Sequence, residues 1–274
     1  MRGILYIVAT PIGNLDDITY RAVNVLKEVD LIAAEDTRHT LKLLNHLGIS
    51  KQLISYYKEN ENVRAGKIIE KLNEGKNIAL VSDAGTPGIS DPGHVLIKEA
   101  INSNIDIVPV PGPCAVITSI ICSGFDTSEF TFIGFLSAKT NEKMKKLNDI
   151  KNETRTLIFY ESPHKVQDTL VTMLKVLGDR NIVICRELTK IHEEFIRGKI
   201  SDIKDKLELR GEMVIIVQGA DKSQNDLEKE ERSKLSLEEH YKFYEKQGFE
   251  KKEIIKLIAK DRGVNRNEIY KKFI

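Results

Sequence analysis

Short apolar runs alternate with amphipathic segments through the first 123 residues, and this alternation constrains the fold more than any other feature of the chain. The runs lie at residues 3–9, 31–37, 77–83 and 105–110, and apolar residues at helical spacing follow each of them. Buried strands joined by helices form a mostly parallel sheet that is covered on both faces. We therefore predict an α/β fold whose first domain, residues 1–123, contains such a sheet.

Each predicted strand leads into a loop rich in turn-forming residues, at positions 10–16, 35–38, 83–93 and 109–114. The carboxyl ends of parallel strands meet at one edge of a sheet, and ligands bind beside that edge. One loop rich in glycine and proline is common. Four of them at the same edge predict a binding pocket.

The pattern changes after residues 124–130, "GFDTSEF", which predict a hinge. Five strand-like runs follow, and only a few residues separate "CREL" from "EEFIRG". A connection this short joins antiparallel strands, so we predict a second α/β domain with a mixed sheet over residues 124–220. Residues 221–235 are polar and free of aromatic side chains, which indicates a linker.

Residues 236–274 predict a small C-terminal domain of three helices. Ser236 and Asn265 begin capping-box patterns, and Gly248 and Gly263 stand where two of the helices would end. From residue 241 onward the chain has ten Lys or Arg and five Asp or Glu. A basic unit of this kind resembles a helix-turn-helix and indicates nucleic-acid binding, although a helical cap for packing or dimerisation has the same pattern.

Charge and composition exclude several classes of protein. The formal net charge is +1 at pH 7, which argues against a protein that coats nucleic acid over its whole surface. No apolar stretch reaches the roughly 18 residues of a membrane span, and no signal peptide precedes the first strand, so we expect a cytoplasmic protein with no membrane partner. The three cysteines form no CxxC pair and the six histidines no HExxH motif, so we predict no bound metal.

The loop "VSDAGTPGISDPG", residues 81–93, has no Lys or Arg, which excludes a P-loop for phosphates. The first loop has a single glycine, which excludes the dinucleotide fingerprint GxGxxG, and the chain has no GxSxG nucleophile motif. The loops offer backbone groups, short side chains and carboxylates, which suit a neutral or cationic ligand. S-adenosylmethionine, which carries a sulfonium charge, is compatible with this chemistry.

Seven motifs follow one another over residues 4–219: "ATPIGNLDDITYRAV", "AAEDTRHT", "VSDAGTPGISDPG", "PVPGPCA", "FIGFL", "LIFYESPHK" and "GEMVIIVQG". Together they resemble the tetrapyrrole-methylase superfamily of S-adenosylmethionine-dependent methyltransferases, and within it the ribosomal RNA small-subunit methyltransferase I group. The chain departs from the usual pattern of that group at Ser137 and Ala138, in place of proline and arginine, and at Cys114, in place of serine.

This resemblance implies two α/β domains that bind S-adenosylmethionine, and 2′-O-methylation of a cytidine ribose in 16S rRNA. A carboxylate near the 2′-hydroxyl could accept its proton. The candidates are Asp36, Glu35, Asp91 and Glu161, with Asp36 preferred and Arg38 orienting a phosphate or the carboxylate. An equally weighted alternative is that "EDTR" forms a salt-bridge network that holds its loop. The donor contacts implied lie in Pro11–Gly13, Asp83–Ile89 and Cys114–Ala115, and in parts of Tyr160–Glu161 and Glu212–Val214. The residues expected to bind the donor are Pro11, Ile12, Gly13, Asp83, Gly85, Thr86, Ile89, Cys114, Ala115, Tyr160 and Met213.

The partner implied is 16S rRNA in the small ribosomal subunit, contacted by the basic residues 139–155 and the C-terminal helices, and the group implies a homodimer. Two alternatives stay open. One is a methyltransferase that acts on ring carbons of a tetrapyrrole, such as a corrinoid or sirohaem precursor. The other is a nucleic-acid-binding regulator without enzymatic activity. Binding of a methyl donor separates the enzymes from the regulator, and the acceptor separates the two enzymes.

Overall fold

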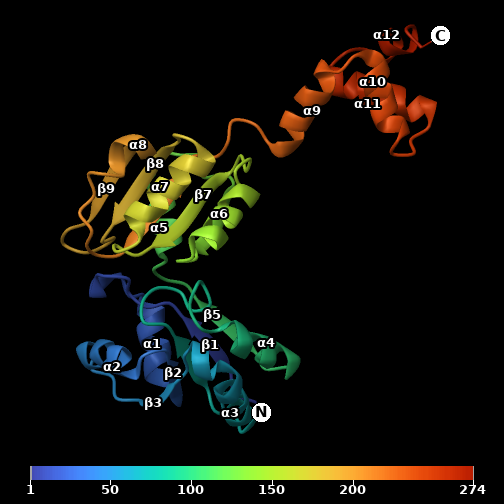
Figure 1. Ribbon diagram of the computed structural model, residues 1–274. Coiled ribbons are helices and arrows are strands. Elements are labelled where there is room, and N and C mark those ends of the chain that lie inside the picture. The colour runs from blue at the N-terminus through green and yellow to red at the C-terminus, as the bar shows by residue number, and fades with distance from the viewer. Residues whose placement is uncertain (1, 274) are drawn as a thin grey trace.

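The computed structural model describes residues 2–273. Figure 1 shows two α/β domains stacked on one another and a group of C-terminal helices that extends away from the second domain. The predicted fold class is confirmed, because one sheet is parallel, the other is mixed, and helices follow at the C-terminus. Within residues 2–273, the structure has no helix long and apolar enough to cross a membrane.

The first sheet has the strand order β3-β2-β4-β1-β5, and all neighbouring strands are parallel. One apolar cluster packs α1 and α2 on one face, and a second cluster packs α3 and α4 on the other. Neither β3 nor α3 is among the elements expected above from the sequence. Strand β3 is a short edge strand with no buried residue, whereas α3 does have buried apolar residues at helical spacing, Ala65, Ile68, Ile69 and Leu72. The elements are β1 (Leu5–Val8), α1 (Tyr20–Glu28), β2 (Leu31–Ala34), α2 (Thr37–His46), β3 (Gln52–Ser55), α3 (Glu61–Asn73), β4 (Ile78–Val81), α4 (His94–Asn102), β5 (Ile107–Val110) and α5 (Ala115–Ile121), with short 3-10 helices at Leu15–Asp17 and Lys58–Asn60.

The second sheet has the order β6-β7-β10-β8-β9, in which β6 and β7 are parallel and the other neighbours are antiparallel. Helix α5, which the sequence groups with the first domain, packs on this sheet: Val116 and Ile120 join Ile158 and Val183 in one apolar cluster. Helix α5 therefore follows the last strand of the first sheet in the chain but packs in the core of the second domain. The elements are β6 (Phe130–Phe135), α6 (Thr140–Asp149), β7 (Thr156–Glu161), α7 (Val166–Leu177), β8 (Asn181–Arg186), β9 (Glu194–Lys199), α8 (Ile200–Ile203) and β10 (Met213–Val217).

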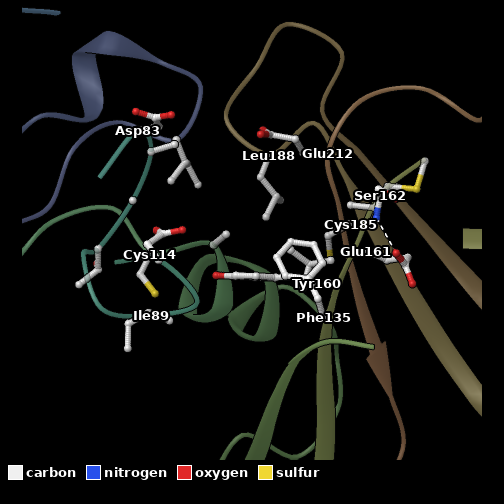
Figure 2. A pocket seen from close by; sticks show the side chains of 18 of the residues that line it. Asp83, Ile89, Cys114, Phe135, Tyr160, Glu161, Ser162, Cys185, Leu188 and Glu212 are labelled. Carbon is white, nitrogen blue, oxygen red and sulfur yellow. Dashed lines mark hydrogen bonds between the residues drawn. The ribbon is translucent and has the colours of Figure 1, made fainter. Parts of the chain in front are cut away.

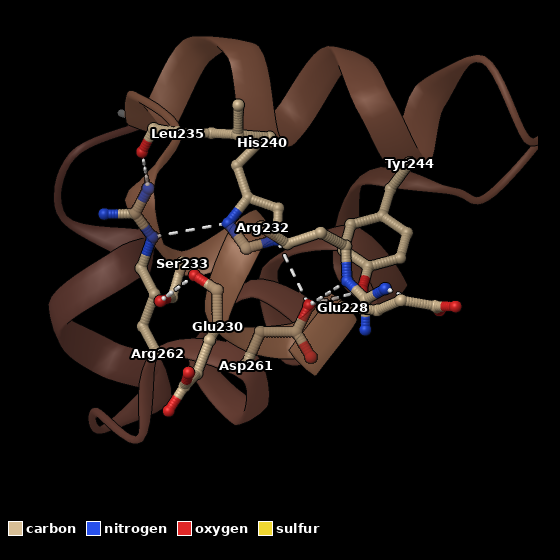
Figure 3. Close-up of polar contacts among 9 residues, drawn as sticks. All are labelled: Glu228, Glu230, Arg232, Ser233, Leu235, His240, Tyr244, Asp261 and Arg262. Carbon is tan, nitrogen blue, oxygen red and sulfur yellow. Dashed lines mark hydrogen bonds and ion pairs between the residues drawn. The ribbon is translucent and has the colours of Figure 1, made fainter. Parts of the chain in front are cut away.

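Helix α9 (Gln224–Lys234) occupies the segment in which the sequence indicates only a polar linker. A capping box between Ser223 and Asp226 begins the helix, and Arg232 Nε donates to Asp261 Oδ2 at 3.0 Å. The contact between Arg232 and Asp261, shown in Figure 3, holds the helix against the C-terminal unit. The helix has no apolar face that the sequence pattern could reveal.

The C-terminal unit continues with α10 (Leu237–Glu245), α11 (Lys251–Arg262) and α12 (Arg266–Tyr270). The capping box at Ser236 forms, and Gly263 ends α11 in the left-handed conformation, as expected. At α12 the Asn265 side chain accepts a hydrogen bond from the backbone N–H of Asn267. The buried His240 lies against Asp261, with 3.2 Å between Nε2 and Oδ2, and burial lowers the pKa of this histidine (Figure 3).

Candidate active site

A cavity of about 360 Å³ lies where the carboxyl edge of the first sheet faces the second domain (Figure 2). Its walls come from the loops after β1, β2 and β4, from the start of α5, and from the ends of β6, β7, β8 and β10. Both domains therefore build it. The lining residues are Ile12, Glu35, Asp83, Ala84, Gly85, Thr86, Ile89, Asp91, Cys114, Ala115, Phe135, Tyr160, Glu161, Ser162, Pro163, Cys185, Leu188, Glu212, Met213 and Val214.

Backbone hydrogen bonds bring three loops of the first domain together at this cavity. The N–H of Thr10 donates to the carbonyl of Gly85 at 2.8 Å, and the N–H of Gly85 donates to the carbonyl of Thr10 at 3.0 Å. The Thr86 hydroxyl donates to the carbonyl of Pro113 at 3.1 Å. Gly85 has a φ of +82°, which glycine adopts without strain, and a Cβ there would lie 3.3 Å from Cγ2 of Ile12. The glycine thus lets two lining segments approach closely.

Gly13 lies where the first loop approaches the second domain. A Cβ at Gly13 would lie 2.5 Å from Lys190 Cγ and 2.9 Å from the Leu188 carbonyl oxygen. Gly13 therefore lets the first loop approach the segment after β8 in the second domain. Neither Gly13 nor Pro11 is among the described residues that line the cavity. The structure places the other residues expected to contact the donor in the lining: Ile12, Asp83, Gly85, Thr86, Ile89, Cys114, Ala115, Tyr160 and Met213.

Asp36 and Arg38, preferred for catalysis in the sequence interpretation, are not part of the cavity lining as the structure describes it. The Arg38 guanidinium donates to both carboxylate oxygens of Asp36, at 3.1 and 2.7 Å, and the Arg38 backbone N–H donates to Oδ1 at 2.8 Å. These hydrogen bonds hold the pKa of Asp36 well below its usual range. The Asp36 carboxylate caps α2 and forms an ion pair with Arg38, and both contacts stabilise the loop between β2 and α2.

Three other carboxylates, on Glu35, Asp83 and Asp91, come together in the cavity from two loops. Asp83 Oδ1 accepts a hydrogen bond from the backbone N–H of Asp36 at 2.9 Å, and Glu35 Oε2 accepts one from the N–H of Asp83 at 3.4 Å. Burial is the main cause of a raised pKa at Glu35. Burial, followed by the nearby negative charge of Glu35, raises the pKa of Asp91 to about 6.

Glu161, the fourth candidate acid, is buried and already bonded within the chain. Its Oε1 accepts from the Ser162 N–H at 2.8 Å, and its Oε2 accepts from the Thr169 hydroxyl at 2.6 Å. The buried Lys143 lies behind this pair and donates to the Thr169 oxygen at 2.9 Å and to Asp168 at 2.6 Å. The dashed bond at Glu161 in Figure 2 belongs to this network. Both carboxylate oxygens of Glu161 already accept hydrogen bonds within the chain, so this residue stabilises the end of β7.

The charge of the lining restricts its ligands. Five lining residues are acidic, and none of the described lining residues is Lys, Arg or His. Lys190 approaches from outside the lining and pairs with Glu212, with 3.0 Å between Nζ and Oε2. Such a cavity disfavours phosphates and favours a cation. Within residues 2–273, no group of three or more His, Cys, Asp or Glu side chains is arranged so that it could hold a metal ion.

Sequence reasoning missed five residues of the lining: Phe135, Ser162, Pro163, Cys185 and Leu188. Phe135 stands in "FIGFL", and Ser162 and Pro163 stand in "LIFYESPHK", so the motifs contain three of them. Which residue of a strand faces a cavity depends on the pairing register, which neither motif reveals. Cys185 and Leu188 begin and end the run "CREL", which is not one of the seven motifs.

The fold and the cavity define a class of enzyme. The model of the tetrapyrrole (corrin/porphyrin) methylase family matches residues 4–204. Among solved structures, diphthine synthase has the same fold, with a TM-score of 0.61 and 12% sequence identity over 79% of this chain and 90% of that chain.

Relatives with known names indicate a particular group within this family of methylases. The ribosomal RNA small subunit methyltransferase I of Halalkalibacterium halodurans is 47% identical, over 98% of this chain and 94% of that protein. The Bacillus subtilis protein of the same name is 46% identical, over 98% of this chain and 93% of that protein. The chain therefore belongs to the tetrapyrrole methylase family and, within it, to the group of ribosomal RNA small subunit methyltransferase I. The predicted methyltransferase identity is confirmed, and the comparisons favour neither the tetrapyrrole-specific enzyme nor the non-enzymatic regulator.

Proposed function

We propose that this protein transfers a methyl group from S-adenosylmethionine to the 2′-hydroxyl of a cytidine ribose in 16S rRNA, within the small ribosomal subunit. The observation that carries the proposal is the acidic cavity between the two domains, in a chain closely similar to proteins named as methyltransferases of small-subunit rRNA. A homodimer that works in the cytoplasm is part of the same proposal.

The residues of the cavity fit the methyl donor. When bound, S-adenosylmethionine supplies a methyl group carried on a positively charged sulfur. The carboxylates of Glu35, Asp83 and Asp91 favour a cation, and no basic side chain among the described lining residues competes for them. Gly85 removes the Cβ that would crowd the wall, and Cys114 and Ala115 are small enough to leave room at the start of α5. These residues, with Ile12 and Met213, would hold the donor.

Asp91 is the residue we assign to accept the proton of the ribose 2′-hydroxyl. Its pKa of about 6 leaves it ionised at neutral pH and close enough to neutrality to accept a proton effectively. Asp36 is unsuited to this role, because its bonds to Arg38 strongly favour its ionised form. Glu35 supports Asp91 by its nearby charge. The remainder of the catalysis comes from holding the ribose in line, since orientation alone can contribute several kcal/mol.

Exposed basic residues of the chain are placed to bind RNA phosphates. On α11, Lys252, Lys256 and Lys260 follow one another at four-residue spacing and are exposed, while Ile254, Ile255 and Ile258 are buried. Lys145 and Lys146 are exposed on α6. Lysines of this kind bind the sugar-phosphate backbone without reading base sequence. We therefore assign affinity to these helices and chemistry to the cavity.

Methyl transfer with radiolabelled S-adenosylmethionine tests the proposal. The acceptors are small ribosomal subunits from cells that lack this enzyme, naked 16S rRNA, and a tetrapyrrole precursor. We expect label on subunits, and alkali digestion of that RNA should release it in an alkali-resistant dinucleotide, because a 2′-O-methyl group prevents cleavage at its own phosphodiester. Label in alkali-sensitive mononucleotides would place the methyl on a base. Label on the tetrapyrrole alone would overturn the proposal.

A further inference from the structure

Phe135 is a large aromatic side chain at the cavity, and it has no part in the proposed methyl transfer. It lines the cavity, yet it is 61% exposed. The edge-to-face contact with Tyr160 sets its ring, with 5.5 Å between ring centroids, and Tyr160 also contacts Phe132 at 4.9 Å. The Phe135 ring therefore packs against Tyr160 on one side and is exposed to solvent on the other, beside the cavity (Figure 2).

An irregularity in β6 places Phe135 there. The pairing of β6 with β7 shifts between Phe132 and Gly134, so one extra residue of β6 stands opposite the same stretch of β7. With strict alternation, Phe135 would lie on the face of Ile133, which packs in the core beneath α6 and α7. The bulge transfers it to the face of Phe132 and Tyr160.

Gly134 makes this bulge possible, and it joins the two sides of the cavity. Its φ is +75°, a conformation that glycine adopts without strain. A Cβ at Gly134 would lie 3.2 Å from Ser90 Oγ, in the loop that carries Ile89 and Asp91. Phe135 therefore stands next to the loop that supplies the proposed proton acceptor.

We propose that Phe135 is the platform on which a base of the RNA substrate stacks, next to the ribose that receives the methyl group. This inference rests on the proposed function. A 2′-hydroxyl can reach Asp91 only if its nucleotide lies at the cavity mouth, and aromatic side chains bind single-stranded bases by stacking. Every base has a π-face, so such a platform positions the nucleotide without demanding a particular sequence.

Substitutions at Phe135 separate stacking from ordinary packing. Phe135→Ala and Phe135→Leu should lower kcat/KM for rRNA by about 5- to 150-fold, which is the range for loss of one stacked base. Phe135→Tyr should retain the rate, because its ring still stacks, whereas leucine keeps apolar volume without a ring. The affinity for S-adenosylhomocysteine should stay unchanged in all three. A leucine variant as active as the tyrosine variant would overturn the proposal, as would loss of dimer by Phe135→Ala in size-exclusion chromatography.

The absence of tryptophan from the chain permits a direct measurement of binding. Phe135→Trp introduces a single tryptophan at the platform, and Ile101→Trp places one at a residue of equal exposure, 61%, near the end of α4. An oligocytidylate of eight nucleotides should quench the fluorescence of the first variant and leave the second unchanged. Quenching by S-adenosylhomocysteine instead would assign Phe135 to the donor site and overturn the proposal, as would no quenching by either ligand.

The proposed function can fail separately from this inference. Failure of the proposed function appears as wild-type protein that transfers no label to ribosomal subunits. Failure of the inference appears as wild-type protein that methylates rRNA while Phe135→Ala does so at the same rate.

Discussion

Asp36 and Asp91 follow two strands of the same parallel sheet at the same edge, and their environments differ in every respect that matters for chemistry. Asp36 caps a helix, pairs with Arg38 and lies outside the cavity lining. Asp91 lies inside the cavity near Glu35, and the described residues form no ion pair with it. The pKa of Asp36 is lowered by hydrogen bonds, and that of Asp91 is raised by burial.

This difference shows how the same fold gives one aspartate a stabilising role and leaves the other able to accept a proton. A carboxylate that is paired with arginine strengthens its loop and loses its ability to take a proton at neutral pH. A carboxylate held among other acids without a cation destabilises the fold but becomes a better proton acceptor. Substitutions at the two aspartates should therefore have opposite effects on stability and very different effects on rate.

The largest effect is expected on the rate of Asp91→Asn. Loss of the proposed proton acceptor should reduce kcat for rRNA methylation by about 10²- to 10⁴-fold. The loss of donor affinity should be smaller, because Glu35 and Asp83 still carry negative charge toward the cation. In the wild type, kcat/KM should rise with pH through about pH 6 and then level off, because Asp91 must be ionised to accept a proton. Rate measurements from pH 5 to about pH 9 check both expectations. An asparagine variant with the wild-type rate would remove Asp91 from the mechanism.

The next effect is a gain of stability in the same variant. The pKa of Asp91 is about 6 in the folded protein against 3.8 for an ordinary aspartate, so its ionised form opposes folding above pH 6. Asp91→Asn should raise the free energy of unfolding by about 1 to 3 kcal/mol at pH 7.5. The gain should vanish near pH 4, where the carboxyl is protonated in the folded state. Urea unfolding at both pH values measures it, and an equal gain at both would contradict the assigned cause.

The smallest effect belongs to Asp36→Asn. This change weakens the pairing with Arg38 while asparagine can still cap α2, so the melting temperature should fall by a few degrees at most. The rate of methylation should change little. Because the lowered pKa of Asp36 means that its contribution is present at neutral pH and lost under strongly acidic conditions, the difference in melting temperature should shrink as the pH falls. A fall in kcat comparable to that of Asp91→Asn would restore Asp36 as a catalytic residue.

The sequence predicts those parts of the fold that depend on local patterns. Ala22, Val25 and Leu26 recur at helical spacing, and the apolar run that forms β4 is buried throughout, so the element types and the parallel sheet follow directly. Strand β3 and helix α9 escape prediction because neither has a clear apolar pattern. Contacts far apart in sequence, such as Arg232 with Asp261, hold α9 in place.

In the candidate site too, features that depend on local sequence could be predicted, and features that depend on contacts far apart in the chain could not. Loops at the carboxyl edge could be assigned to a pocket from the sequence, because strand direction alone brings them together. The roles of the four acids could not, since Asp36 and Asp91 differ only in partners and burial. Phe135 escapes because its face depends on a one-residue bulge at Gly134, and a shift of one residue reverses the side of the sheet on which a side chain lies.

Whether the cavity between the two domains binds the methyl donor is the central claim, and cysteine alkylation tests it most directly. Cys114 lines the cavity, Cys122 is exposed and serves as an internal control, and burial raises the pKa of Cys185 to about 12, so this thiol should react slowly. Labelling with iodoacetamide is followed at each cysteine by mass spectrometry, with and without S-adenosylhomocysteine. The account predicts that the ligand slows labelling of Cys114 and leaves Cys122 unchanged. Equal rates at Cys114 with and without saturating ligand would place the donor elsewhere and contradict the account.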